Sequence, residues 1–422
     1  MPTFRPSTMS TMSPSTNIPF ALPSIGAEEE AGVIEVLRSG WLTTGRVTEK
    51  FEAEFAAAVG SRHALAVSSA TAGLHLSLEA LGVRAGDLVI TSPYTFAATA
   101  EVARYLGAHP YFVDIDPDTM NIDPARIAEA LHRRRRIRRA PARGRLAAIL
   151  PVHFGGLPCD MATILEAARS SGVPVVEDAA HAFPVRAAGL GGSFRFVGTL
   201  GRAGVYSFYA TKTITTGEGG MVVTDDEEVA ERVALMRLHG IDRQVWDRYT
   251  SERPSWEYQV VEAGYKYNLT DLASAIGRAQ LAKANALLGR RRAIARRYLS
   301  AFADADWLRL PVSSDEHAWH LFTLRIIPGR LTIDRDEFIR SLMEHGVGAS
   351  VHFIPLHVMP YYRNLYGFRP QDYPNALQAF QTVVSIPIYP ALTDDQVERV
   401  IDTVKSIGEA HYRGGSDGAP RG

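Results

Sequence analysis

Lysine is rare in this chain, so each lysine is a candidate for chemistry that arginine cannot perform. Forty of the 45 basic residues are arginine, and the five lysines are Lys50, Lys212, Lys266, Lys283 and Lys405. Only an amine can lose its proton near neutral pH and condense with a carbonyl group. Lys50, Lys283 and Lys405 fall in amphipathic helical patterns, where a solvated surface position is expected. Lys212 instead follows a β-rich run, in a turn rich in Thr and Gly, and is our candidate for covalent catalysis.

The segment 64–81 joins a β-rich run to a helical pattern through small residues. The run ends in Ser68-Ser69-Ala70-Thr71, and leucines follow at helical spacing. The free amides and the positive dipole end of a helix N-terminus attract anions, and small side chains let a phosphate approach closely. The segment therefore predicts a phosphate site around Ala70 and Thr71. An ordinary Ser or Thr helix cap would give the same pattern.

A third candidate is Asp178, which ends the buried-type strand pattern VPVVED. In doubly wound sheets, ligands bind at the carboxyl ends of the strands. A carboxylate there could pair with a protonated ring nitrogen, hold a metal ion or cap the following turn. A metal is the weakest of these, because no HExxH motif occurs and His352 and His357 lack helical spacing. We expect no metal site.

One cofactor accounts for all three candidates together. Pyridoxal 5′-phosphate needs an anion cup for its phosphate, a carboxylate for its pyridine nitrogen and an amine that condenses with its aldehyde. Asp178 would keep the ring protonated, and Lys212 would act as general base and acid. An aromatic side chain should stack on the ring, and Phe96 is our candidate, although it could instead belong to the core.

The elements that must position these residues alternate along the chain. Short β-rich runs separated by helical patterns, up to about residue 285, predict a parallel sheet covered on both faces. A long helix from about 276 to 303 and an α+β pattern follow. The predicted divisions are a disordered tail (1–17), an N-terminal arm (18–39), a large domain (40–285), a small domain (286–412) and a flexible tail (413–422).

Composition excludes several other classes of protein. The chain has 422 residues, a formal net charge of −1 and a single cysteine, Cys159. No apolar run approaches the ~20 residues that cross a bilayer. We expect a soluble, cytoplasmic protein without membrane association. Eight arginines lie between 133 and 145, but no aromatic residues interleave them, so a solvated helix end is favoured over a nucleic-acid site.

The motifs resemble those of the DegT/DnrJ/StrS family of nucleotide-sugar aminotransferases, from about Ile18 to Ile407. The motifs that carry the resemblance are SGWLTTG (39–45), FEAEFAAAVG (51–60), VSSATAGLHL (67–76), VEDAAHA (176–182), YSFYATKTITTGEGG (206–220), GYKYNLTDLASAIG (264–277), HAWHLFTLRI (317–326) and VHFIPLH (351–357). The resemblance implies a fold-type I transferase, with a three-layer α/β/α large domain on a mostly parallel sheet and a smaller α+β C-terminal domain.

The resemblance also implies a role for each matching residue. Lys212 would carry the cofactor and Asp178 would pair with its ring nitrogen. The implied cofactor contacts are Ala70, Thr71 and Ser207 at the phosphate, Phe96 stacked on the ring, His181 beside it, and Asn268 from the neighbouring subunit of a homodimer. The implied substrate contacts are Thr43, Thr44, Lys266, His352 and His357.

The implied activity is transfer of an amino group from L-glutamate to a keto carbon, C4 being favoured, of a nucleotide-activated deoxy sugar. The motif versions resemble most the branch that makes UDP-4-amino-4-deoxy-L-arabinose. Phe96 stands where that branch has Trp, and the loop 186–197 is longer than usual. Two alternatives stay open at this point: a pyridoxal-phosphate dehydratase or isomerase of the same sugars, and a non-catalytic nucleotide-sugar-binding regulator.

Overall fold

The structure is a computed structural model that describes residues 17–133, 144–242 and 258–413. The predicted disordered tail (1–17) lies outside the described residues except for Asn17, and the predicted C-terminal tail (413–422) lies outside them except for Arg413. Most of the arginine-rich segment also lies outside them. Of its arginines with described side chains, Arg145 pairs with Asp87 over 3.1 Å.

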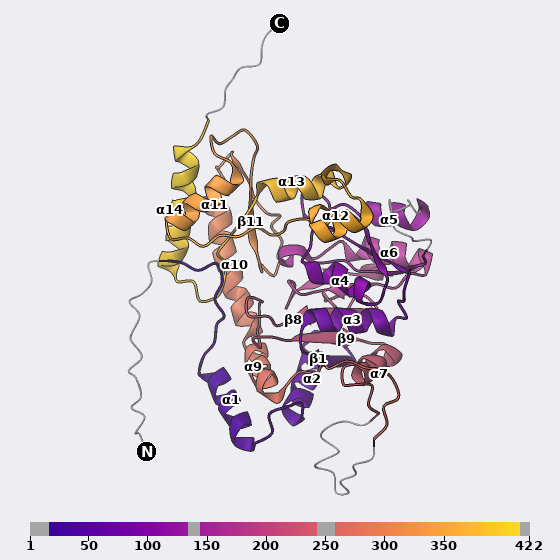
Figure 1. The fold of residues 1–422 in the computed structure, drawn as a ribbon. Coiled ribbons are helices and arrows are strands. Elements are labelled where there is room, and N and C mark those ends of the chain that lie inside the picture. The colour runs from indigo at the N-terminus through magenta and orange to yellow at the C-terminus, as the bar shows by residue number, and fades with distance from the viewer. Residues whose placement is uncertain (1–16, 134–143, 243–257, 414–422) are drawn as a thin grey trace, which may run out of the picture.

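A twisted sheet forms the centre of the large domain (Figure 1). Backbone pairing gives the strand orders β1-β9-β8-β5 and β3-β2-β4. A parallel bridge between Ile149 and Val175 joins the two groups beside β4 and β5. Only β9 runs against its neighbours, so the sheet is mostly parallel, as predicted. The strands are β1 (His63–Val67), β2 (Leu88–Thr91), β3 (His109–Phe112), β4 (Leu146–Ile149), β5 (Val176–Asp178), β8 (Ala203–Ser207) and β9 (Gly220–Thr224).

Helices cover both faces of this sheet, because successive strand residues point to opposite sides. On β1, Leu65 and Val67 pack in one hydrophobic cluster, while Ala64 and Ala66 pack in another. The sheet and its helices therefore make three layers, as predicted. The helices of this domain are α2 (Arg46–Val59), α3 (Ala70–Ala80), α4 (Ala97–Tyr105), α5 (Pro124–Arg133), α6 (Met161–Ser171), α7 (Glu227–Met236) and α9 (Asp271–Ala282).

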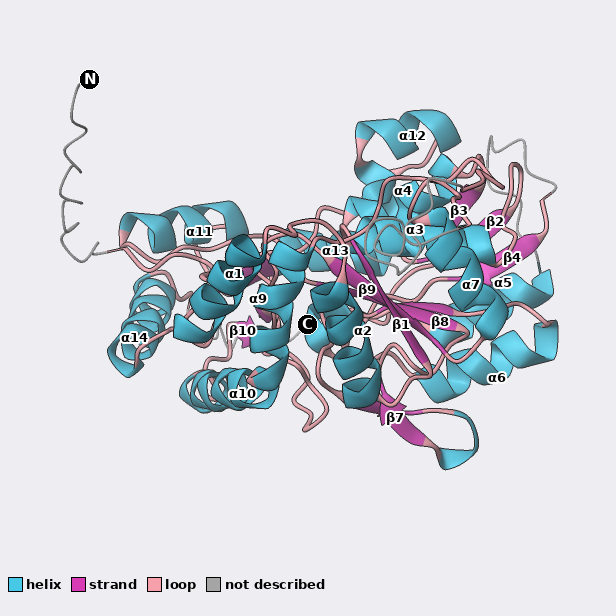
Figure 2. Cartoon of the chain, turned by 90° about the horizontal axis from the view of Figure 1, so that it is seen from below, coloured by secondary structure: helices cyan, strands magenta, loops and turns pink. Residues whose placement is uncertain are grey.

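The segment 186–197, which the sequence marks as long, forms a β-hairpin. Strands β6 (Arg186–Ala188) and β7 (Phe194–Phe196) pair antiparallel. Figure 2 shows the hairpin projecting from the body of the large domain.

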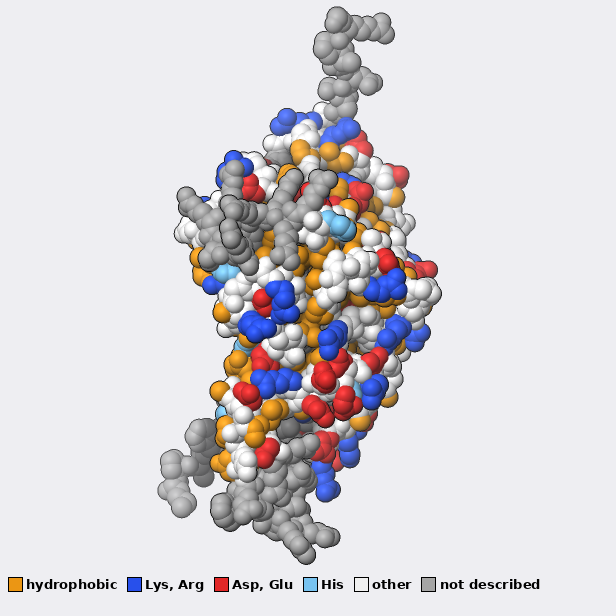
Figure 3. Space-filling model, turned by 90° about the vertical axis from the view of Figure 1, so that its right-hand side faces the viewer, with side chains coloured by type: hydrophobic (Ala, Val, Ile, Leu, Met, Phe, Trp, Pro, Cys, Tyr) orange, Lys and Arg blue, Asp and Glu red, His pale blue; other side chains and the backbone are white. Residues whose placement is uncertain are grey.

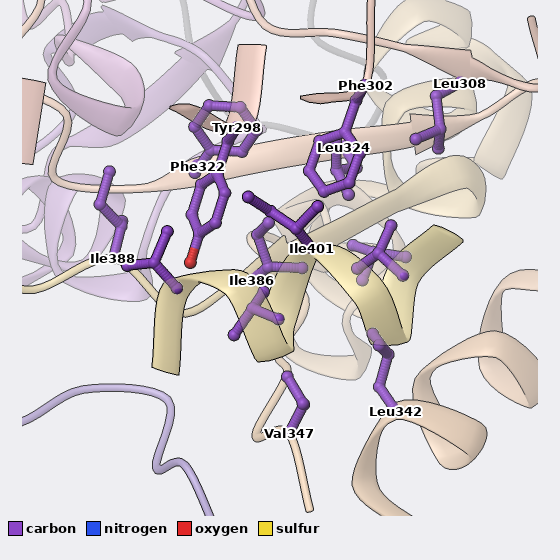
Figure 4. Close-up of a cluster of buried hydrophobic side chains, with 14 of the residues drawn as sticks. Tyr298, Phe302, Leu308, Phe322, Leu324, Leu342, Val347, Ile386, Ile388 and Ile401 are labelled. Carbon is purple, nitrogen blue, oxygen red and sulfur yellow. The ribbon is translucent and has the colours of Figure 1, made fainter. Parts of the chain in front are cut away.

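The C-terminal domain has its own sheet and core. Its sheet has the order β10-β11-β12 (Leu308–Arg309, Phe322–Ile326, Val383–Ile386). Figure 4 shows Tyr298, Phe322 and Ile386 among the side chains that fill the core between the helices and this sheet. The helices that pack on this core are α10 (Ala284–Ala301), α11 (Arg335–Glu344) and α14 (Asp394–Ala410). Helix α13 (Pro374–Thr382) contacts β11, and α12 (Pro360–Tyr366) packs against α4 and β3 of the large domain.

The N-terminal arm contacts both domains. Ile18 is buried in the C-terminal core and pairs with Val347. Helix α1 (Ala27–Ser39) then lies beside α9 (Figure 1). Buried Glu29 of α1 pairs with Lys283 over 2.6 Å.

The single helix predicted over 276–303 is wrong. Helix α9 ends at Ala282 and α10 begins at Ala284, with Lys283 at φ −105° and ψ 7° between them. No Gly or Pro marks this break in the sequence. At this break the Lys283 ammonium is held by Glu29 of the arm over 2.8 Å. We propose the division between the domains at this break, close to residue 285.

Charges are mixed over the surface that Figure 3 shows. Lys and Arg side chains are interspersed there with Asp and Glu. Among the described residues, no helix combines the length and apolar character needed to cross a membrane.

Candidate active site

A cavity of about 570 Å³ lies where the two domains and the arm meet. It is lined from the large domain by the N-termini of α3 and α4, the end of β5 and the turn after β8. The structure brings eight predicted site residues into its wall: Ala70, Thr71, Phe96, Asp178, His181, Ser207, Lys212 and His352.

The predicted phosphate cup combines a helix N-terminus with a strand end. Ser69 caps α3 by accepting the Ala72 amide over 3.1 Å, so the cap interpretation of this sequence also holds. Ala70 and Thr71 line the cavity next to it, and Ser207 faces them from the end of β8. Gly220 permits the close packing behind the cup, because an added Cβ would lie 2.7 Å from the Ala70 nitrogen.

Asp178 lies at the carboxyl end of β5, buried and held by hydrogen bonds. Its Oδ2 accepts the Thr99 hydroxyl over 2.8 Å, and its Oδ1 accepts the Ala180 amide over 3.2 Å. Burial raises the pKa of the Asp178 carboxyl, while these bonds and the nearby Lys212 oppose the rise. A cationic ring nitrogen in the cavity would favour the carboxylate in the same way.

Lys212 lies in the threonine-rich turn between β8 and β9. The turn satisfies its own backbone, since Thr215 Oγ1 donates to the Phe208 carbonyl and accepts the Gly217 amide. Burial lowers the pKa of Lys212 to about 8, and the charge of Asp178 opposes that shift. A lysine with this pKa is unprotonated often enough near neutral pH to attack a carbonyl.

Histidines enclose the amine. His181 follows β5, and its Nδ1 accepts the Gly155 amide over 3.3 Å. His352 comes from the C-terminal domain and donates or accepts at Nδ1 with the Ser385 hydroxyl over 2.9 Å. Burial lowers the pKa of His352 to about 4 and that of His181 well below its usual value. Both rings are therefore neutral, and among the described residues no group of three His, Cys, Asp or Glu is arranged to hold a metal ion.

Phe96 is the N-cap residue of α4, with its ring exposed at the cavity wall. Phe353 approaches it with ring centroids 6.4 Å apart. An exposed ring beside the cavity fits a stacking position better than a core position.

Four predicted residues, Thr43, Thr44, Lys266 and Asn268, lie outside this cavity. Thr44 Oγ1 donates to the Leu269 carbonyl and accepts Asn268 Nδ2 over 2.6 Å. Thr43 and Lys266 are exposed. They belong to the same two chain segments, 43–44 and 264–268, as Thr44 and Asn268. None of the four lines this chain's own cavity.

His357 is not brought to the cavity. Its ring is fully buried, packs on Tyr373 with centroids 4.8 Å apart and meets the Pro370 carbonyl over 3.0 Å. The prediction that His357 contacts the substrate is therefore wrong, because its imidazole is buried in the packing around α12 and α13 and has no face toward the cavity. We assign His357 to the core.

The sequence left three residues of this wall without a role. Thr99 holds Asp178, Phe20 of the arm stacks on His352 with centroids 5.4 Å apart, and His320 lies against His181. Two features of the sequence could have pointed to these residues: Thr99 lies one helical turn after Phe96, and His320 is part of the HAWH motif.

The donor set fits the cofactor that the sequence suggests. The cup, the Asp178 carboxylate and the Lys212 amine all line one cavity, and Phe96 and His181 lie at its wall. An anion, a ring cation and an aldehyde each find a chemically matched group there.

Comparison with known proteins gives a consistent result. Residues 23–405 match the model of the DegT/DnrJ/EryC1/StrS aminotransferase family. The chain is 44% identical over 393 residues to the spore coat polysaccharide biosynthesis protein SpsC of Bacillus subtilis, covering 92% of this chain and 97% of SpsC.

Solved structures are similar over the same length. The aminotransferase Spr1654 of Streptococcus pneumoniae superimposes with a TM-score of 0.83 at 30% identity, covering 93% of this chain and all of the other, and is known in a PMP form and a PLP form. PseC of Helicobacter pylori, an aminotransferase involved in the biosynthesis of pseudoaminic acid, gives a TM-score of 0.82 at 27% identity, with 93% and 100% covered.

Proposed function

Because the chain belongs to the DegT/DnrJ/EryC1/StrS aminotransferase family, and is a pyridoxal-phosphate enzyme, we propose its two substrates. The amino donor is L-glutamate, and the acceptor is a nucleotide-activated deoxy sugar with a keto group, at C4. The observation that carries the proposal is the shared cavity of Lys212 and Asp178, with the phosphate cup beside them.

When bound, pyridoxal phosphate supplies an aldehyde that takes up the amino group and a protonated ring that withdraws electrons from the carbon losing its proton. Lys212 Nζ takes the proton from Cα of the donor and returns a proton to the acceptor carbon, which its pKa of about 8 allows in both directions. Asp178 would accept a hydrogen bond from the protonated ring nitrogen and so keep that proton in place. His181 and His352 stay neutral, so they can orient the substrate without forming an ion pair with Asp178 in place of the cofactor's ring nitrogen.

The walls of the cavity support a sugar acceptor. Phe20, Phe96 and Phe353 contribute aromatic rings, which pack well against the apolar face of a pyranose and exclude water. SpsC and PseC, by their names, act in polysaccharide and pseudoaminic acid biosynthesis. The VSSATAG, EDAAHA and GYKYNLTD versions of the motifs favour a UDP-linked 4-keto sugar, as in the 4-amino-4-deoxy-L-arabinose branch.

We also propose that the enzyme is a cytoplasmic homodimer with shared active sites. Thr43, Thr44, Lys266 and Asn268 lie outside this chain's own cavity, which supports their serving the partner's site. Nucleotide sugars and glutamate are cytoplasmic metabolites, which supports the location.

The test separates the two half-reactions. The holoenzyme is first incubated with L-glutamate alone, and 2-oxoglutarate and the cofactor's absorbance are measured. UDP- and dTDP-linked 4-keto and 3-keto sugars are then added, and the products are identified by mass spectrometry and NMR. We expect stoichiometric 2-oxoglutarate and a 4-amino sugar. Loss of water without amine transfer would indicate a dehydratase, and a protein that binds no cofactor would indicate a binding function.

A further inference from the structure

The backbone at Trp319 adopts a conformation that a bulky residue rarely takes. Its φ is +50°, in the left-handed region where Gly and Asn are usual. The indole is buried and stacks on His317 with ring centroids 3.9 Å apart and an interplanar angle of 3°. Such a conformation persists only where the surroundings fix it, and it is concentrated at functional sites.

Arg291 is the first of the groups that hold this turn. It is buried in α10, and its Nη1 donates to the carbonyls of Trp319, His320 and Ile388 over 3.2, 3.4 and 2.6 Å. Within the described part of the chain, the hydrogen bonds of this guanidinium go to backbone carbonyls and none goes to a carboxylate. Burial lowers the pKa of Arg291 to about 10. A cation kept in the core without an acid is therefore used to bind the backbone of Trp319 and His320.

The dipeptide Gly155-Gly156 holds the turn from the other side. The Gly156 carbonyl accepts the Ala318 amide over 2.8 Å, and the Gly155 carbonyl accepts the Leu321 amide over 3.1 Å. The Gly155 amide meanwhile donates to His181 Nδ1 over 3.3 Å. An added Cβ at Gly156 would lie 2.9 Å from both Ala318 Cβ and the His181 carbonyl oxygen. The same two glycines thus fix the turn and the active-site histidine.

This arrangement brings two imidazole rings into contact. The rings of His320 and His181 lie with centroids 4.3 Å apart and an interplanar angle of 38°. Phe353 stacks on His181 at 6.0 Å. Because Nδ1 of His181 accepts a hydrogen bond, its hydrogen is on Nε2.

We propose that His320 is a positioning residue of the active site: the turn 317–321, held by Arg291 and Gly155-Gly156, packs its ring on His181 and keeps that imidazole buried in the tautomer with hydrogen on Nε2. This inference rests on the proposed function, since His181 matters only if the cavity holds the cofactor. The left-handed backbone conformation of Trp319 then has a role, because it sets the direction in which the next residue, His320, points.

If the His320 ring is removed, His181 should titrate in a pH range in which it stays neutral in the intact site. Burial is the largest cause of the lowered pKa of His181, and the neighbouring basic side chains Lys212, His352 and His153 lower it further, while Asp178 lies on the same strand end. Loss of the His320 ring would admit water to His181 and return its pKa toward the ordinary value of about 6.5.

The experiment follows the absorbance of the bound cofactor against pH in the holoenzyme. His320→Ala should show an additional titration near pH 6 that is absent from wild type and from His320→Phe, which keeps a ring in place, once the protonation of the cofactor's own imine, common to all three, is accounted for. His357→Ala is the matched control, a buried histidine outside the cavity, and should behave as wild type. A folded, cofactor-loaded His320→Ala protein with the wild-type spectrum across this range would overturn the proposal.

A second pair of variants covers the case in which His320→Ala does not fold. Gly156→Ala should displace the turn and give the same new titration. Gly329→Ala is its control, since Gly329 also has positive φ (+82°) but has open space around it. An unchanged Gly156→Ala spectrum would likewise contradict the proposal. Failure of the proposed function is distinguishable, because it would appear as wild-type holoenzyme that forms no 2-oxoglutarate from L-glutamate or aminates none of the keto sugars, whatever the spectra of the variants show.

Discussion

Thr99 donates its hydroxyl to Oδ2 of Asp178 over 2.8 Å, so the first turn of α4 is tied to the carboxyl end of β5. Thr95 in turn shares a hydrogen bond with the Thr99 hydroxyl over 2.8 Å. A buried carboxylate is thus given a fixed direction and a donor that favours its charged form.

Removing this donor should weaken cofactor binding. Thr99→Val keeps the shape but raises the pKa of Asp178 further, because the hydroxyl is one of the groups that oppose the effect of burial. A hydrogen bond to a charged group contributes about 1.5–3 kcal/mol, so the Kd for pyridoxal phosphate should rise about 10- to 100-fold. The loss should grow as the pH falls. Thr99→Ser should restore binding, and equal Kd values for all three proteins would refute the role of the hydroxyl.

The pKa of Lys212 should be visible in the rate of cofactor uptake by the apoprotein. Only the unprotonated amine attacks the aldehyde, and a pKa of about 8 leaves about one molecule in ten unprotonated at pH 7. The rate constant, measured by stopped-flow absorbance, should rise about tenfold per pH unit below pH 8 and then level off. Asp178→Asn should move the plateau to lower pH, because the carboxylate raises the pKa of Lys212. A rate that still climbs at pH 10 would contradict the burial argument.

Glu177 should contribute to the free energy of unfolding, although it does not line the cavity. Its fully buried carboxylate accepts the amides of Gly198, Leu200 and Gly201 over 2.8, 2.6 and 2.7 Å, and His153 Nε2 lies 3.2 Å away. Glu177→Gln places an NH₂ group against these donors. We expect a loss of about 3–5 kcal/mol in the free energy of unfolding, measured by denaturant titration.

Exposed Glu166 provides the matched control for that loss. It pairs with Arg169 on the surface of α6, and Glu166→Gln should change stability by less than about 1 kcal/mol. Equal effects of the two substitutions would show that the buried contacts of Glu177 are unimportant.

His352 and His357 should differ although only five positions separate them. His352 lines the cavity and stacks on Phe20, so His352→Ala should lower kcat/KM at least about tenfold. His357→Ala should instead lower stability by about 1–3 kcal/mol and leave kcat/KM near the wild-type value. Steady-state kinetics with thermal melts distinguish the two effects. Loss of kcat/KM in His357→Ala at full stability would return that residue to the site.

The parts of the site that could be predicted from the sequence are those fixed locally. The cup at Ala70 and Thr71, the strand-end Asp178 and the turn with Lys212 each lie where a strand meets a turn or helix, and that junction is visible in the residue pattern. The alternation of strands and helices likewise predicts the layered large domain.

The remaining parts depend on contacts between distant segments. Phe20 lines the cavity two residues after Ile18, which is buried in the C-terminal core, and Lys283 lies at a helix break where Glu29 of the arm binds it. No local pattern distinguishes His352 from His357, since the path of the chain around α12 and α13 decides which ring faces the cavity. Such choices depend on packing between elements, which periodicity does not describe.

Lys212 is expected to form the covalent bond to the cofactor, in the cavity that it shares with Asp178. Reduction of the holoenzyme with sodium borohydride, followed by peptide mass spectrometry, tests it most directly. We expect the cofactor's mass on the peptide that contains Lys212, and none on Lys212→Ala protein. Modification at another lysine, such as Lys266, or reduction that leaves the cofactor free, would contradict it.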